Sequence, residues 1–324
     1  MTRIPKRKRL SIRILWTILK DSANGFVDDK LMKLSGALAY YTIFSMGPLL
    51  LIIITLCGLF FGRDAVQGKV YAQLEGFVGR DTASQLQSII QHAAISGKGT
   101  LATVVGIVLL VIGASSVFAE IQDSINMIWG LKPKPKAGWL LFLKNRLLSF
   151  SIIVSLAFLL LVSLGISAMI DILGNKLQAH FPGLSVVVIY IINNLITVAI
   201  TTVIFAVIFK VLPDANIRWK DVITGAVATM ILFLLGKFGI SYYISKSNIG
   251  STYGAAGSLI VLLLWVYYSA MILYFGAGFT KFYAVHVGDE IKPAEYAVTV
   301  EHIEKEKGRM SIQQKENLKE NPGK

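Results

Sequence analysis

Three polar side chains interrupt an otherwise apolar run, and their types would allow them to carry a proton or hold an ion. They are Ser116, Glu120 and Asp123, and their spacing of four and then three residues places them on one face of an α-helix. A carboxylate at the centre of a membrane helix costs about 2.5–3.5 kcal/mol on insertion scales. We therefore expect this face to turn toward protein or water, as a polar cavity, an inner gate or a helix-end anchor.

Two further polar groups fall inside apolar segments. Asn193, Thr197 and Thr201 share a helix face because they are spaced by four residues. Such side chains commonly form interhelical hydrogen bonds worth about 1 kcal/mol or less, and they could also line a polar path. Lys237 is the one basic residue well inside an apolar segment. It could reach the outer interface, where Asp171 is its candidate partner in an ion pair.

Residues typical of metal or nucleophilic catalysis are sparse in this chain. Its single cysteine, Cys57, excludes an intrachain disulfide and a thiolate metal cluster. The four histidines are scattered and show no zinc-site spacing. Glu120 and Asp123 alone are too few ligands to indicate a catalytic Mg²⁺ site. We expect no metal, no cofactor and no enzymatic activity.

Composition and charge indicate a membrane protein. Of the 324 residues, 54% are hydrophobic, and uncharged apolar runs of membrane-spanning length separate the charged loops. The net charge of +13 is concentrated at the ends and in loops, without a basic stripe interleaved with aromatic residues. Nucleic acid is therefore not an expected partner. Membrane lipids are the expected partners, with anionic headgroups at the basic ends of the chain.

The apolar segments predict an all-α fold, a polytopic membrane bundle of about six transmembrane helices with additional short amphipathic helices. Together these spans form a transmembrane domain over residues 37–284. The predicted spans are residues 37–61, 100–121, 147–170, 184–211, 222–243 and 259–283. Gly47 and Pro48 fall in the first span, where proline removes a backbone donor, so we expect a kink there.

The remaining segments flank or connect the spans. Residues 1–36 form a basic segment, and residues 63–99 form an external segment with two short amphipathic helices. Residues 285–324 form a charged tail that is partly disordered. Within the first segment, a helix at the membrane surface is predicted by the apolar face of Ile12, Leu15, Trp16 and Leu19.

The distribution of lysine and arginine predicts the topology. Twenty-five of these residues lie in residues 1–36, in the loops after the second and fourth spans (with Lys210 counted in the second of these loops) and in the tail counted from Lys281, against six in the three opposite loops. Because positive residues are enriched on the cytoplasmic side, both termini are expected in the cytoplasm. An even number of spans agrees with this placement.

Several segments taken together resemble one family. They are Gly36–Ser45 continuing through Pro48, Gly113–Gly130, Val211–Asp214, Ile217–Asp221, and Tyr253-Gly254 with Leu264–Tyr267. In combination, over residues 30–285, they are similar to the YihY/BrkB family. The resemblance implies a bacterial inner-membrane protein with about six spans. Lys237 matches a lysine often seen in the family, whereas Gly276-Ala277-Gly278 departs from its usual Gly-Ala-Glu.

The resemblance also bears on function. Members of the family were long labelled ribonuclease BN, and lipid or envelope-related transport has been suggested for some. The first hypothesis is accordingly a transporter or lipid translocator that uses the intramembrane polar residues. The alternative is a non-transporting scaffold for envelope partners. A tRNA-processing ribonuclease finds no support in the residues, which lack a water-exposed acid–base or metal site beside a basic groove.

Overall fold

The structure is a computed structural model, and it describes residues 11–45, 75, 83–84, 116–134, 182–246 and 257–300. Several predictions lie wholly or largely outside these residues. They concern the kink at Gly47 and Pro48, the acid Asp171, the tail beyond residue 300, the external segment 63–99 and the spans at 37–61, 100–121 and 147–170.

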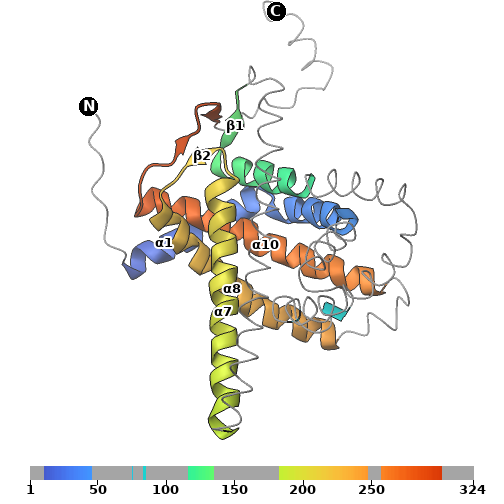
Figure 1. The fold of residues 1–324 in the computed structure, drawn as a ribbon. Helices are drawn as coiled ribbons and strands as arrows, with labels where there is room; N and C mark the ends of the chain where they lie inside the picture. Colours follow the sequence, from blue (N-terminus) through green and yellow to red (C-terminus); the bar gives the residue numbers. More distant parts are fainter. Residues whose placement is uncertain are drawn as a thin grey trace, which may run out of the picture.

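The described residues are mostly helical (Figure 1). The helices are α1 (Ile12–Asp28), residues 31–45, residues 116–129, α7 (Pro182–Val211), α8 (Trp219–Lys246) and α10 (Gly257–His286). Three of them contain stretches long and apolar enough to cross a membrane, namely Asn194–Val211, Trp219–Ile244 and Leu259–His286. These stretches correspond to the last three predicted spans, so the predicted helical membrane fold is confirmed. The count of six spans stays a prediction.

Helices α8 and α10 pack closely because glycine on each helix faces threonine on the other. A Cβ atom at Gly225 of α8 would overlap Thr280, and a Cβ atom at Gly276 of α10 would overlap Thr229. Each threonine hydroxyl also donates a 2.7 Å hydrogen bond to a carbonyl of its own helix. Small residues thus let the two backbones approach, as is typical of membrane helices.

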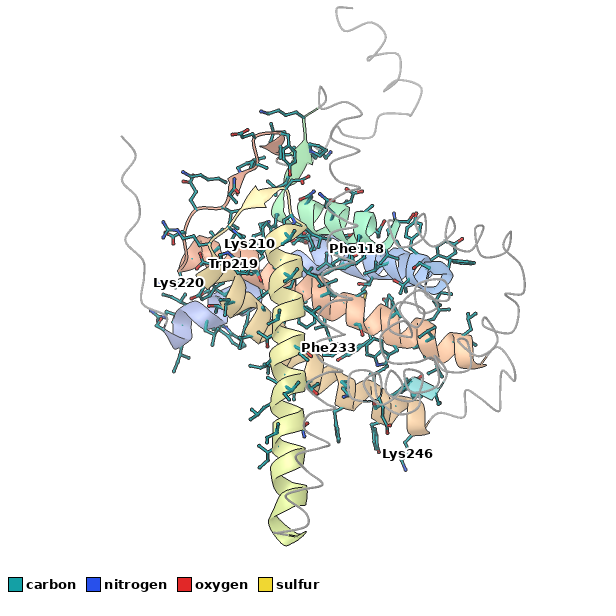
Figure 2. All side chains as sticks on the ribbon, viewed as in Figure 1. Phe118, Lys210, Trp219, Lys220, Phe233 and Lys246 are labelled. Carbon is teal, nitrogen blue, oxygen red and sulfur yellow. The ribbon has the colours of Figure 1, made fainter. Side chains whose placement is uncertain are left out.

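The core lies where helix 116–129 meets α7, α8 and α10. Its fully buried side chains include Ile125, Phe209, Val222 and Tyr274, one from each of these four helices. In Figure 2, α8 runs from Trp219, close to the short strands, to Lys246 at the opposite end of the helix. Side chains from all four helices therefore share one buried cluster.

Four short strands join loops that are far apart in the sequence. Strand β1 (Leu131–Pro133) pairs antiparallel with β4 (Ala297–Thr299), and β2 (Ala215–Asn216) pairs antiparallel with β3 (Lys292–Pro293). These strands were not predicted from the sequence, since each is only two or three residues long. We call residues 130–134, 212–217 and 287–300 the strand end (Figure 1).

A sharp turn connects helix 116–129 to β1. Gly130 has φ = +68°, a backbone conformation that favours glycine because it has no Cβ atom. The Val300 amide donates a 2.7 Å hydrogen bond to the Gly130 carbonyl. The turn therefore brings the C-terminal segment directly over the end of helix 116–129.

Candidate functional site

The candidate site is a buried carboxylate at the strand end. Asp214 follows α7 in the turn formed by residues 212–214 and is 2% exposed. Its Oδ1 accepts a 2.9 Å hydrogen bond from Nε2 of Gln122, and its Oδ2 accepts one of 2.9 Å from Nδ2 of Asn126. Gln122 and Asn126 are spaced by one helical turn, so helix 116–129 presents both amides on the same face.

The backbone of Asp214 takes part in the same network. Its amide donates a 2.8 Å hydrogen bond to Oδ1 of Asn126, so this asparagine is bonded twice to one residue. Its carbonyl accepts a 2.9 Å bond from the Ala294 amide, and Oδ1 accepts a 3.2 Å bond from the hydroxyl of Tyr296. One aspartate thus connects helix 116–129, the turn after α7 and the C-terminal segment.

The donors around this carboxylate are all uncharged. Among the described residues, no lysine, arginine or histidine forms an ion pair with Asp214. The residue also lies at the C-terminal end of α7, where the helix dipole is negative and disfavours an additional negative charge. A buried carboxylate held only by neutral donors is costly unless all its hydrogen bonds are made. The closed arrangement therefore depends on these amide and phenol donors.

Nearby titratable groups respond to the charge of Asp214. Burial, the Asp214 carboxylate and the hydrogen bond to it raise the pKa of Tyr296 to about 12, so the phenol remains a donor at neutral pH. Burial and the same carboxylate raise the pKa of Asp123 above its usual value. Asp123 and Tyr296 therefore both respond to the charge of Asp214 as well as to their own burial.

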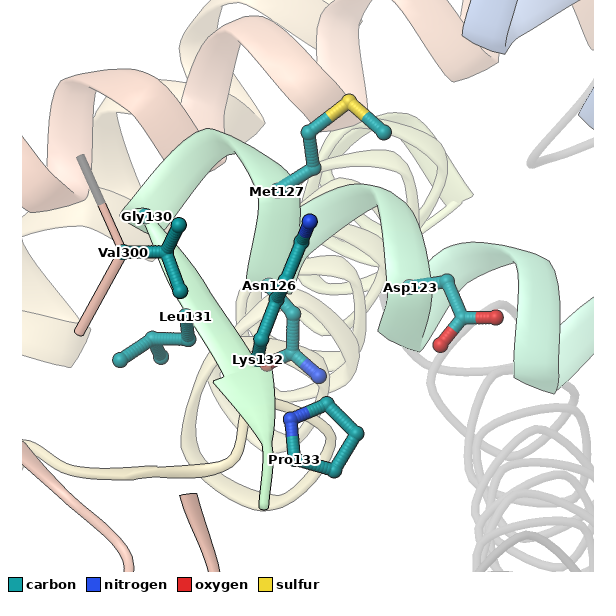
Figure 3. Close-up of a pocket in the computed structure, with 8 residues that line it drawn as sticks. All are labelled: Asp123, Asn126, Met127, Gly130, Leu131, Lys132, Pro133 and Val300. Carbon is teal, nitrogen blue, oxygen red and sulfur yellow. The ribbon is translucent and has the colours of Figure 1, made fainter. Parts of the chain in front are cut away.

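A pocket of about 260 Å³ lies beside the network (Figure 3). Its walls come from the last turns of helix 116–129, from β1 and from the C-terminal segment, and they are mostly apolar. The lining residues are Asp123, Asn126, Met127, Gly130, Leu131, Lys132, Pro133 and Val300. In Figure 3, Asp123 stands at one side of this pocket, away from Leu131 and Val300. Asn126 thus belongs to both the pocket and the network.

The residues predicted from sequence are distributed over three helices. Ser116, Glu120 and Asp123 lie on helix 116–129, where Asp123 comes within electrostatic range of Asp214. Thr201 on α7 is buried, and its hydroxyl donates a 2.7 Å hydrogen bond to the carbonyl of Thr197. This bond is intrahelical, as is common for threonine in membrane helices.

Other predicted residues lie farther from the strand end or outside the description. Lys237 is partly buried in the half of α8 that leads away from the strand end toward Lys246. The side chain of Asn193, and Asp171 with its predicted ion pair to Lys237, are not among the described parts of the chain. The outer ion pair and the shared polar cavity therefore stay predictions.

Sequence reasoning missed four residues of the network: Gln122, Asn126, Asp214 and Tyr296. Two signals were present for three of them. Gln122 and Asn126 have i, i+4 spacing within the stretch that carries Glu120, and Asp214 closes a motif used in the family resemblance. Tyr296 had no sequence signal, because only the folding back of the C-terminal segment brings its hydroxyl to the carboxylate.

Helix 116–129 is also tied to α10. The indole Nε1 of Trp129 donates a 3.0 Å hydrogen bond to the carbonyl of Ala277, and the ammonium of Lys281 donates one of 2.7 Å to the carbonyl of Ile128. Gly278 faces the same helix end, and among the described residues a Cβ atom there would meet Ile128 at 3.9 Å, an ordinary contact distance. The described part of the chain therefore leaves space for a Cβ atom at this position.

The three long apolar helices, with the buried Asp214 network at one end, define a multi-span helical membrane protein. Residues 22–298 match the family model described as Virulence factor BrkB. The chain therefore belongs to this family, which confirms the resemblance noted in its sequence.

Curated relatives carry the name UPF0761 membrane protein. The chain is 26% identical over 258 residues to the one from Ralstonia nicotianae, which covers 77% of this chain and 55% of the relative. It is 25% identical to that of Pseudoalteromonas atlantica, over 80% of this chain and 83% of the relative. It is 26% identical to that of Haemophilus influenzae, over 78% of this chain and 89% of the relative. No solved structure was found to match the chain.

Proposed function

We propose that the protein is a transporter or lipid translocator of the bacterial inner membrane with a role in the cell envelope. In this proposal the strand end is its closed inner gate. The observation that carries the proposal is the Asp214 network, in which a buried carboxylate without an ion-pair partner among the described residues connects three segments. Ionisable groups within membrane segments commonly mark ion and substrate pathways, and Asp214 lies three residues after the apolar stretch Asn194–Val211.

The orientation of the protein follows from its positive charges. Twenty-five lysine and arginine residues fall on the side that includes both termini and the strand end, against six on the other side. Lys210 lies over the ring of Trp219 at 5.7 Å, so a basic and an aromatic side chain meet at this end, as at a membrane interface (Figure 2). We therefore assign the strand end to the cytoplasm.

Opening of this gate would separate the C-terminal segment from the turn after α7. Asp214 would then lose the Tyr296 hydroxyl from its carboxylate and the Ala294 amide from its backbone carbonyl, and water or a cation could reach the carboxylate in their place. Glu120 and Asp123 lie on the same helix as the two amides and extend the acidic surface toward the predicted span at 100–121. The acidic residues would thus form the inner part of a path for a cation, a proton or a lipid headgroup.

One observation favours the alternative of a non-transporting scaffold. Asp214 is well supplied with hydrogen bonds in the closed arrangement, so the network can also serve as a permanent anchor that holds the C-terminal segment against the bundle. The two functions differ in whether the strand end opens. Transport requires it to open, whereas a scaffold does not.

Reconstitution into liposomes separates the two functions. Purified protein is tested for movement of fluorescent phospholipid between leaflets and for dissipation of a proton gradient, with Asp214→Asn and Glu120→Gln as variants. Asp28→Asn is the matched control, because Asp28 is an exposed carboxylate at the end of α1. We expect at least one activity in the wild type and in the control, reduced in both variants while their elution on size exclusion is unchanged. Absence of both activities in the wild type would contradict transport and favour the scaffold.

A further inference from the structure

Helix α1 leaves an apolar face uncovered. Ile12 is 90% exposed and Trp16 is 70% exposed, and Leu15 and Leu19 next to them are 36% and 37% exposed. These four side chains share one side of the helix by their spacing of three and four residues. Large apolar side chains exposed together on one face of a described helix indicate a surface that contacts an apolar phase or a partner.

The opposite side of α1 is held by the protein. Ile18 is fully buried in a cluster with Phe279 and Tyr283 of α10. Asp21 and His286 lie 3.3 Å apart across the same two helices. Since α10 contains a stretch long and apolar enough to cross a membrane, this packing ties α1 to one end of that stretch.

The position of α1 along α10 places it at the end of a span. Its contacts are with the last turns of α10, directly before the strand end, and Figure 1 shows α1 beside that end of α10. A helix held at the end of a membrane span lies where headgroups meet the acyl chains. Tryptophan is a typical residue at this depth because its ring is apolar and its N–H is polar.

The charge next to this face is positive. Residues 1–20 contain seven lysine and arginine residues and no acidic residue. Arg13 and Lys20 border the uncovered apolar face, because both are exposed and lie one residue after Ile12 and Leu19. An apolar helix face with a basic edge is complementary to a leaflet that carries anionic lipids.

We propose that the uncovered face of α1, formed by Ile12, Leu15, Trp16 and Leu19, is a docking surface for anionic phospholipid in the cytoplasmic leaflet. The apolar side chains enter the boundary between headgroups and acyl chains, and Arg13 and Lys20 contact the phosphates. This inference does not depend on transport. It requires that α10 spans the membrane and that the strand end faces the cytoplasm, as proposed above.

The test uses the full chain in lipid nanodiscs with one fluorescent probe attached to a cysteine in a Cys57→Ser background. The probe is placed at Ile12→Cys on the apolar face or at Asn24→Cys, an exposed polar position of the same helix, as the matched control. Quenching is measured with spin-labelled phosphatidylglycerol, with spin-labelled phosphatidylcholine and with aqueous iodide. We expect the Ile12 probe to be quenched by lipid and protected from iodide, and the Asn24 probe to show the reverse.

The preference for anionic lipid is tested by neutralising the basic edge. Phosphatidylglycerol should quench the Ile12 probe more strongly than phosphatidylcholine, and each of Arg13→Gln and Lys20→Gln should reduce this preference by about fivefold. High salt should weaken it as well. Equal quenching by the two lipids would overturn the anionic preference, and equal iodide quenching at both sites would overturn docking. Protection from lipid and iodide alike, which depends on protein concentration, would assign the face to a second copy and also overturn the proposal.

Discussion

Asn126→Ala removes both hydrogen bonds that this side chain makes to Asp214. The carboxylate loses a donor, which costs about 1.5–3 kcal/mol for a bond to a charged group, and the buried Asp214 amide loses its acceptor, which costs about 1–3 kcal/mol. The expected loss of stability is therefore about 2.5–6 kcal/mol. For a chain of 324 residues that corresponds to a fall in unfolding temperature of about 4–9 °C.

Asn126→Asp is the sharper variant because it replaces the donor with a second carboxylate. Asn126 Nδ2 lies 2.9 Å from Asp214 Oδ2, and two carboxylates at that separation cannot both be ionised. The pair must share a proton, so its pKa in the folded protein lies above that in the unfolded chain. Stability is then present at acidic pH and is lost as the pH rises through the raised pKa. The variant should be strongly destabilised at pH 8 and recover toward pH 5.

The assay is thermal unfolding in detergent, followed by fluorescence-detected size exclusion, over this pH range. Asn216→Ala and Asn216→Asp are the controls, because Asn216 is an exposed asparagine at the same strand end. We expect both controls to unfold close to the wild type at each pH. If Asn126→Asp shows the pH dependence of its control, Asp214 is not held as an ionised acceptor and the reasoning is refuted.

Three further predictions concern packing, charge and the C-terminal segment. Gly225→Ala should lower stability by about 1–3 kcal/mol, because its Cβ atom would overlap Thr280 of α10. Gly239→Ala in the same helix is the control and should leave stability unchanged, because its Cβ atom meets none of the described residues within 4 Å. Similar losses of stability in the two variants would argue against close packing of α8 and α10. Asp123→Asn should raise stability at neutral pH, because a raised pKa means that the ionised carboxylate of Asp123 is less favourable in the folded protein than in the unfolded chain. The measurement is unfolding as a function of pH, and a less stable variant at neutral pH would contradict the raised pKa of Asp123. Tyr296→Phe removes a donor to Asp214, so hydrogen exchange of residues 287–300 should become faster, and unchanged exchange would show that the phenol does not hold the segment.

The candidate site was only partly predictable from sequence. Glu120 and Asp123 stood out because charge is rare in apolar segments, and they led to the helix that carries the network. The residue types of Gln122 and Asn126 did not by themselves indicate a site, since neutral amides near a helix end are common. Only the contact with Asp214, 88 residues away from Asn126 in the chain, gives these amides a role.

The sequence by itself determined that this is a helical membrane protein of a recognisable family. Long apolar runs must form helices in lipid, because every backbone polar group has to be satisfied within its own segment, and this constraint acts locally. The tertiary structure decided what closes the strand end. Strands of two or three residues are too short to be specified by their own pattern, and they form only where folded helices bring loops and the C-terminal segment together. The same packing decided that Asp214, a turn residue in the sequence, becomes the buried acceptor that joins three segments.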